Sequence, residues 1–174
     1  MQEAASSGRF LIDIPDSTAA VALSGSGQKN LHRLESHTGA TCVIRGLQLE
    51  ISGRVSQAER AKALVELMRP IWQEGQQLRE VDLQEAITSL DTGQTSAHTE
   101  LGHFILARSQ RGNLLRPRTL RQKAYVEAME HHDLTFALGP AGTGKTFLAT
   151  VLAVRMLMER KVERLVLTRP AVEA

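Results

Sequence analysis

The chain has 174 residues, of which 42% are hydrophobic and 23% charged, as in an ordinary soluble globular protein. Arg155 interrupts the longest apolar run, so no segment reaches the ~20 apolar residues that a transmembrane helix requires. Residues 1–9 lack the pattern of a secretion signal, and a single cysteine, Cys42, excludes an intrachain disulfide and a cysteine-rich zinc site. These features predict a cytoplasmic protein with no membrane partner.

The N-terminal part of the chain predicts a compact domain of alternating strands and helices. The first strand stops at Pro15, and Asp16 or Ser17 is placed to cap the helix that follows. Gly39 closes the next helix, and residues 56–59, Ser-Gln-Ala-Glu, have the spacing of a capping box. The predicted elements are a strand at 10–14, helices at 17–23 and 28–37, a hairpin of strands at 41–45 and 47–52, and a helix from 56 to 70.

This β-α-α-β-β-α order resembles a KH domain, in which a glycine-rich loop between the first two helices clamps the sugar-phosphate backbone of RNA. The corresponding loop is residues 25–29, Gly-Ser-Gly-Gln-Lys, which has G-x-G where the KH signature is G-x-x-G. The resemblance places Lys29 and Arg33 near phosphate. Taken without the resemblance, the residues favour a small α+β domain that mediates protein contacts.

Residues 71–118 are predicted to connect two domains, through an amphipathic helix around Leu83 and Ile87 and a flexible loop at 91–98. A stripe of six basic residues, with no acidic one, follows between residues 102 and 126. Such a stripe suits the phosphates of a nucleotide or of RNA, but it also suits pairing with the acidic segment at 74–100 or simple solvation. The basic stripe consists of Arg108, Arg111, Arg116, Arg118, Arg121 and Lys123.

Residues 139–146 read Gly-Pro-Ala-Gly-Thr-Gly-Lys-Thr and match the phosphate-loop pattern G-x-x-x-x-G-K-[ST] throughout. An apolar segment at 134–138 predicts a strand before this loop, and residues 147–160 predict a helix after it. Glycines let the main chain wrap inward, so that its N–H groups converge on a phosphate chain at the positive end of the helix. Lys145 would bridge the β- and γ-phosphates, and the Thr146 hydroxyl would ligate Mg²⁺, which gives both residues catalytic roles. The predicted nucleotide-binding residues of the loop are Gly139, Pro140, Ala141, Gly142, Thr143, Gly144, Lys145 and Thr146.

A second strand is predicted at 162–168, so that strand, loop, helix and strand form one βαβ unit of a parallel sheet with flanking helices. The predicted fold class is therefore α/β, with a KH-like domain at 1–70, the connector at 71–118 and the first part of a P-loop NTPase domain at 119–174. The six residues after Thr168 provide no later strand to carry the acidic Mg²⁺ ligand and the charge-stabilising arginine that P-loop ATPases use, so we expect the chain to stop within that domain.

The chain resembles the PhoH-like ATPases from about residue 10 onward, most closely in three motifs. These are Arg-Pro-Arg-Thr at 116–119 with Gln122, the phosphate loop at 139–146, and Leu-Thr-Arg-Pro-Ala-Val-Glu-Ala at 167–174. The resemblance implies a cytoplasmic protein that binds ATP and Mg²⁺, is related to superfamily-one helicases, serves RNA metabolism and forms a ring of identical subunits. It also implies an endoribonuclease partner that matures ribosomal RNA in some members.

Two individual residues have competing interpretations. The resemblance implies that Gln122 reads the adenine of ATP, but Thr119-x-x-Gln122 is also a capping box for a helix at 120–130. Arg169 is a candidate sensor of the γ-phosphate or of RNA. The adjacent His131 and His132 cannot face one ligand from a helix, so no metal site is expected there.

Three functions fit these residues. The first is ATP hydrolysis coupled to RNA binding or processing in the intact protein. The second is a module that binds RNA or a protein without turnover. The third is a small-molecule kinase, for which the first 118 residues suggest no acceptor pocket. We predict the first function and keep the other two as alternatives, because a P-loop alone does not define the reaction.

Overall fold

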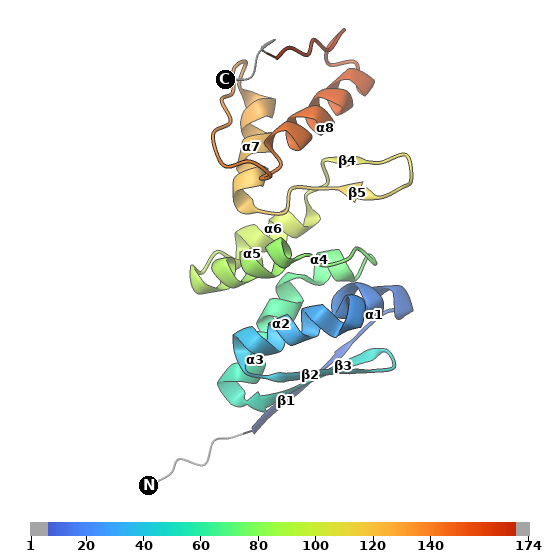
Figure 1. The fold of residues 1–174 in the computed structure, drawn as a ribbon, viewed down its shortest axis with the longest axis vertical. Helices are drawn as coiled ribbons and strands as arrows, with labels where there is room; N and C mark the ends of the chain where they lie inside the picture. The colour runs from blue at the N-terminus through green and yellow to red at the C-terminus, as the bar shows by residue number, and fades with distance from the viewer. Residues whose placement is uncertain (1–6, 170–174) are drawn as a thin grey trace. The chain divides into compact units, whose positions relative to one another are not determined.

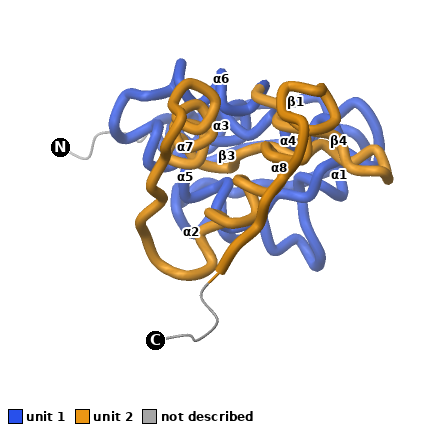
Figure 2. Tube along the Cα trace, turned by 90° about the horizontal axis from the view of Figure 1, so that it is seen from above, with its two compact units in different colours: residues 1–103 blue, residues 104–174 orange. Residues whose placement is uncertain are grey.

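The computed structural model describes residues 7–169 and divides the chain into two compact units, residues 1–103 and residues 104–174 (Figures 1 and 2). Each unit has its own hydrophobic core. Both units combine helices with a small antiparallel sheet, which confirms the mixed α/β class. Among the described residues, no helix combines the length and the apolar character needed to cross a membrane.

The first unit is built on a three-stranded antiparallel sheet in the order β1-β3-β2. Its strands are β1 (Ser7–Asp13), β2 (Thr41–Arg45) and β3 (Gln48–Arg54). The register places Ile12 opposite Leu49 and Cys42 opposite Ile51, and all four side chains are buried. Because successive side chains of a strand point to opposite faces, this register gathers the apolar ones on the face that the helices cover.

Three helices pack against that face of the sheet. They are α1 (Ser17–Ser24), α2 (Lys29–Thr38) and α3 (Val55–Leu67), with a short 3-10 turn, η1 (Ser26–Gln28), between the first two. Asp16 caps α1, since its Oδ1 accepts from the Ala19 N–H at 2.8 Å, and Gly39 ends α2 at φ 73°. The α3 helix begins one residue before the predicted capping box, where the Gln57 side chain accepts from the Arg54 N–H at 3.3 Å. The predicted β-α-α-β-β-α order is present, and its likeness to a KH domain stays a prediction.

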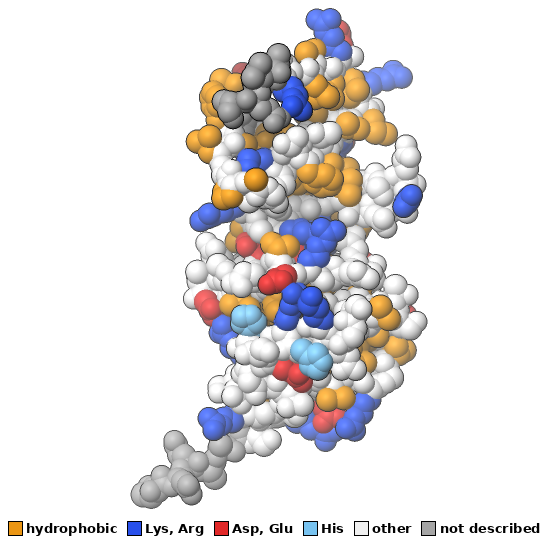
Figure 3. All heavy atoms as spheres, in the orientation of Figure 1, with side chains coloured by type: hydrophobic (Ala, Val, Ile, Leu, Met, Phe, Trp, Pro, Cys, Tyr) orange, Lys and Arg blue, Asp and Glu red, His pale blue; other side chains and the backbone are white. Residues whose placement is uncertain are grey.

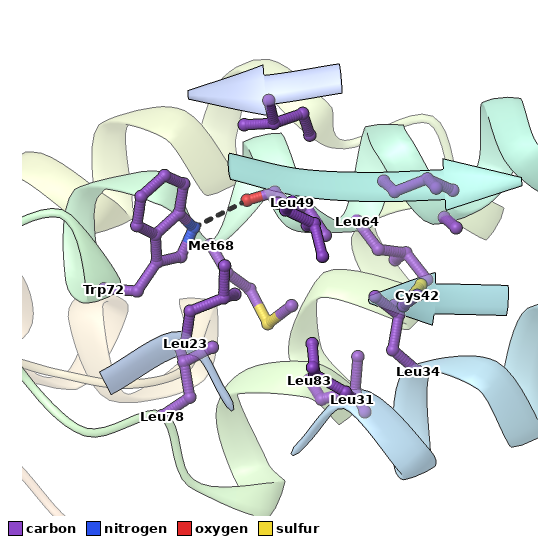
Figure 4. Close-up of a cluster of buried hydrophobic side chains, with 14 of the residues drawn as sticks. Leu23, Leu31, Leu34, Cys42, Leu49, Leu64, Met68, Trp72, Leu78 and Leu83 are labelled. Carbon is purple, nitrogen blue, oxygen red and sulfur yellow. Dashed lines mark hydrogen bonds between the residues drawn. The ribbon is translucent and has the colours of Figure 1, made fainter. Parts of the chain in front are cut away.

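The first unit continues through three further helices. They are α4 (Arg69–Trp72), α5 (Glu80–Asp91) and α6 (Thr95–His103). Trp72 is fully buried, and its indole Nε1 donates to the Val65 carbonyl at 3.0 Å (Figure 4). Leu78 and Leu83 join the same core, so this part of the predicted connector packs with the first unit. The loop predicted at 91–98 was wrong from Thr95 onward, because a helix begins there.

The second unit contains a short hairpin and two helices. They are β4 (Ala107–Arg108), β5 (Leu114–Leu115), α7 (Leu120–His131) and α8 (Lys145–Met158). Its small core consists of Leu106, Val126, Leu148 and Leu152. Arg155 of α8 forms two polar contacts beside this core. Its guanidinium pairs with Glu130 of α7, and its Nη1 donates to the Leu106 carbonyl at 3.2 Å. These contacts hold α8 to α7 and to the segment before the hairpin.

Neither of the predicted parallel strands forms within the described residues. Residues 134–138 and 162–168 are irregular, and no strand of the described chain pairs with them. Their apolar side chains are exposed, with Phe136 at 81%, Leu138 at 94% and Leu167 at 79%. Figure 3 shows hydrophobic side chains on the surface of this unit. The prediction failed because a buried parallel strand requires hydrogen-bonding neighbours and helices on both faces, and residues 7–169 supply neither to these segments.

Candidate functional site

The loop at 139–146 lies in the second unit and leads directly into α8. Gly139, Gly142 and Gly144 have φ of 151°, 78° and 84°, so the loop uses backbone conformations that side chains rarely adopt. Gly144 is the N-cap of α8. The first N–H groups of any α-helix have no intrahelical acceptor, and the helix dipole adds positive potential there. The loop therefore ends where an anion is favoured.

Lys145, the first residue of α8, turns its ammonium group back over the loop. Its Nζ lies 2.8 Å from the Gly139 carbonyl oxygen, 2.6 Å from that of Pro140 and 3.3 Å from Thr143 Oγ1. The Thr143 hydroxyl in turn donates to the Pro140 carbonyl at 2.9 Å. The two ends of the loop are thus joined by charge-assisted hydrogen bonds through one cation.

Thr146 lies in the first turn of α8 and is exposed. Its main-chain oxygen accepts from the Thr150 hydroxyl at 2.8 Å, as in a regular helix turn. A hydroxyl oxygen is a hard ligand of the kind that Mg²⁺ uses beside phosphate oxygens and water. Across residues 7–169, no three His, Cys, Asp or Glu side chains form a group able to hold a metal ion.

Gln122 connects the first turn of α7 with the phosphate loop. Its Nε2 donates to the Thr143 carbonyl at 3.1 Å, and its Oε1 accepts from the Arg118 N–H at 2.6 Å. Its own N–H donates to Thr119 Oγ1 at 3.1 Å, which confirms Thr119 as the N-cap of α7. The other half of the predicted capping box differs, because the Gln122 side chain accepts from the Arg118 N–H and not from that of Thr119. A Cβ at Gly144 would lie 3.3 Å from Gln122 Nε2, so the carboxamide also packs against that glycine.

The structure brings Gln122 and the phosphate loop together but does not make the basic stripe one exposed surface. Arg116 is only 8% exposed, and Lys123 Nζ lies 3.7 Å from Glu127 Oε1. Arg108 and Arg111, by contrast, are exposed around the β4–β5 hairpin. A run of basic residues in the sequence therefore divides into side chains with different surroundings. The third motif lies largely in residues 170–174, outside the described residues.

In the first unit, the loop between α1 and α2 has left-handed backbone. Gly25, Gly27 and Gln28 have φ of 71°, 60° and 60°, and Gln28 holds the fourth position, where the KH signature has glycine. Lys29 is exposed at the start of α2, whereas Arg33 Nη2 lies 2.6 Å from Glu80 Oε2. Of the two side chains predicted to lie near phosphate, Lys29 is accessible and Arg33 is engaged in an ion pair.

The contact between Gln122 and Thr143 was not predicted from the sequence. Twenty-one residues separate these two positions, and no periodicity links a helix turn to a distant loop. The contacts of the Lys145 ammonium with carbonyl groups of its own loop were not predicted either. The sequence signal for these contacts is the P-loop pattern itself, which implies that the residues around the loop lie close together.

A glycine loop that ends in Lys-Thr at a helix N-terminus is the signature of the P-loop class of proteins. A family model described as PhoH-like protein matches residues 114–174, which include both Gln122 and this loop. A PhoH-like protein of Synechocystis sp. is 44% identical over 163 residues, or 94% of this chain and 50% of that relative. Another, of Bacillus subtilis, is 32% identical over 155 residues, or 89% of this chain and 49% of the relative.

A PhoH-like protein of Mycobacterium tuberculosis is 38% identical over 167 residues, which are 95% of this chain and 47% of that relative. The chain belongs to the PhoH-like family. It spans about half the length of the curated relatives it matches. No solved structure is significantly similar to it.

Proposed function

We propose that the chain binds ATP together with Mg²⁺ at residues 139–146 and supplies the nucleotide site of an ATPase. The observation that supports this most strongly is the loop itself, with three glycines at positive φ and Lys145 at the N-terminus of α8. Such a helix end presents N–H donors and positive potential to a phosphate group. Membership of the PhoH-like family supports the same assignment.

Each polar group of the loop has a role toward a triphosphate. The Lys145 ammonium would leave its carbonyl partners and contact the β- and γ-phosphates, and the Thr146 hydroxyl would ligate Mg²⁺. The bound Mg²⁺ would neutralise phosphate charge. Hydrolysis also needs groups that position water and stabilise the transferring phosphoryl group. We assign those groups to the whole protein, because the chain spans about half of its relatives.

Thermal unfolding with and without MgATP tests binding. A ligand that binds only the folded state raises its stability by RT ln(1 + [L]/Kd), so the melting temperature of the parent chain rises with MgATP. Lys145→Ala abolishes this rise but leaves the chain folded. Lys161→Ala is the matched control, since Lys161 is an exposed lysine of the same unit that pairs with Glu159 at 2.7 Å. An equal rise in Lys145→Ala and in the parent would overturn the assignment.

Phosphate release from ATP tests turnover. We expect the whole protein to release phosphate and its Lys145→Ala variant to have lost this release, because the lysine contacts the phosphoryl group that is transferred. Background release in both proteins, together with a nucleotide-dependent melting shift in the parent, would instead identify a module that binds without turnover. Transfer of phosphate to a metabolite rather than to water would identify a kinase.

We further propose that the protein that contains this nucleotide site also binds RNA. The supporting observations are the left-handed loop at 25–28, the exposed Lys29 at the start of α2, and the exposed Arg108 and Arg111 of the hairpin. Single-stranded RNA is held in KH-type modules by its backbone at such a loop and helix N-terminus. Small, dispersed contacts of this kind predict weak, salt-dependent binding.

Fluorescence anisotropy with a labelled single-stranded RNA tests this proposal. Lys29→Gln is expected to weaken binding and to flatten the dependence of affinity on salt by about one counterion. Lys62→Gln is the control, because Lys62 lies in α3 with its Nζ 4.8 Å from the Phe10 ring centroid. Equal affinity and equal salt slopes for all three proteins would exclude Lys29 as an RNA contact.

A further inference from the structure

The geometry points to Gln122 as a positioning residue that holds the phosphate loop in the shape required by a phosphate chain, whatever base that chain carries. This inference rests on the proposed nucleotide binding at residues 139–146. It assigns to Gln122 a role toward the loop itself, in addition to the predicted helix cap and to the adenine reading that the family resemblance implies.

Both ends of the Gln122 carboxamide are bonded to main chain. The oxygen accepts from the Arg118 N–H just before α7, and the nitrogen donates to the Thr143 carbonyl within the loop. Arg118 directly precedes Thr119, the N-cap residue of α7. The side chain therefore acts as a strut from a helix terminus to the loop.

The strut reaches the peptide whose orientation matters for anion binding. A peptide group is planar and trans, so its C=O and N–H point in opposite directions. Fixing the Thr143 carbonyl toward Gln122 consequently turns the Gly144 N–H away from Gln122. That N–H is one of the donors with which a phosphate loop surrounds its ligand. Gln122 thus orients a donor that it does not itself touch.

Two other features fit this role. Gly144 has φ of 84°, and an added Cβ there would meet Gln122 Nε2 at 3.3 Å, so glycine serves both the backbone conformation and the approach of the carboxamide. The Thr143 side chain is bonded separately, to the Pro140 carbonyl and to Lys145 Nζ. Gln122 therefore holds the main chain of Thr143, whereas the Thr143 hydroxyl is bonded to other groups of the loop.

Positioning and adenine reading predict different ligand dependences. A carboxamide has two donors and two acceptor sites, so the two observed bonds leave one of each for a base. Loss of base reading weakens ATP alone. Loss of positioning weakens every ligand that carries the same phosphate chain, because the loop serves the phosphates and not the base.

Calorimetric titration with Mg²⁺ and three ligands, ATP, GTP and inorganic tripolyphosphate, tests the inference. In Gln122→Met, a neutral change of similar length, all three affinities are expected to fall by a similar factor of about 3- to 10-fold, the effect of one hydrogen bond. Gln122→Ala is the second variant, because alanine is the residue best tolerated in helices and keeps α7 intact. A fall for ATP with unchanged tripolyphosphate affinity would overturn the inference.

Two control variants separate positioning from general destabilisation. Thr119→Ala removes the helix cap and keeps the carboxamide, and Gln110→Ala removes an exposed glutamine of the same unit. Both are expected to bind tripolyphosphate as the parent does. An equal loss in Thr119→Ala would show that the effect is only structural and would overturn positioning. Failure of the parent to bind any of the three ligands would overturn the proposed function itself, which is a different result from selective loss of ATP.

Discussion

His98 Nδ1 lies 3.1 Å from the hydroxyl oxygen of Ser89, and both side chains are buried between α5 and α6 of the first unit. Burial lowers the pKa of His98 below its usual value, because a charged imidazole would lose its hydration. The nearby Glu85 and Asp82 carboxylates and a hydrogen bond to the Leu67 backbone oppose this shift without cancelling it. The imidazole is therefore part of the core as a neutral group.

The stability of the first unit should decrease as the pH falls through the usual pKa of histidine. In the unfolded chain His98 takes up a proton near pH ~6.5, whereas in the folded chain it does so only at lower pH. Between these two values the unfolded state binds more protons, so acid lowers the free energy of unfolding, and above that window His98 contributes no slope. Urea titrations over this range measure the slope. His98→Gln should reduce it, and His103→Gln, at an exposed position of α6, should not; identical slopes in all three proteins would contradict the assignment.

A fragment of residues 1–103 should fold cooperatively, and one that ends at residue 70 should be severely destabilised. The shorter fragment lacks Ile71, Trp72 and Leu78, which are buried in the same core as α1 and α3. Loss of one large buried aromatic side chain alone typically costs about 3–5 kcal/mol. Denaturation followed by circular dichroism measures both fragments. Equal midpoints would show that the unit is complete at residue 70.

Gln28→Gly should stabilise the first unit by about 1 kcal/mol. Gln28 has φ of 60°, and a side chain in the left-handed region costs roughly 1–2 kcal/mol that glycine does not incur. Part of this gain is offset by the greater freedom of glycine in the unfolded chain. The matched change is Ser26→Gly in the same turn, which relieves no positive φ and should destabilise. A lower urea midpoint for Gln28→Gly would contradict the backbone assignment.

The thiol of Cys42 should be unreactive in the folded protein. Burial and the nearby Glu35 carboxylate raise its pKa to about 12, so almost no thiolate exists at pH ~8. Its backbone N–H donates to Glu35 Oε1 at 2.8 Å, which fixes this surrounding. Reaction with a disulfide reagent, measured by absorbance, should be negligible in buffer and complete in concentrated guanidinium chloride. Rapid reaction under both conditions would show that the core opens readily.

The local structure of the first unit was largely predictable, because it depends on residues close in sequence. Asp16 caps the start of α1 with its side chain, and Gly39 ends α2 with a left-handed backbone. Both features depend on a few neighbouring residues, so a short sequence pattern predicts them. The burial of Trp72 was not predictable, since it depends on a contact with Val65 and with distant helices. Amphipathic spacing around Leu83 gave the α5 helix but not its packing partner.

In the second unit, the conformation of the phosphate loop was predictable from the sequence, whereas the structure of the segments on either side of its helix was not. The glycine spacing from Gly139 to Gly144 reports directly on backbone conformation, and the structure has positive φ at all three glycines. The segments at 134–138 and 162–168 have the composition of buried strands, but composition describes an environment that other strands must provide. The contact of Gln122 with Thr143 is a tertiary contact, and the local sequence around Gln122 predicts only the helix cap at Thr119.

The ammonium of Lys145 contacts two carbonyl oxygens and a hydroxyl, so the proposed binding of a phosphate chain would be an exchange of partners. A phosphate oxygen would have to replace contacts of 2.6 and 2.8 Å to uncharged dipoles, so the enthalpy released on binding would be the difference between two sets of bonds. The same arrangement shields the loop carbonyls from one another. Replacing Lys145 by a neutral residue would therefore change the hydrogen bonds of the loop itself as well as its contacts with a phosphate chain.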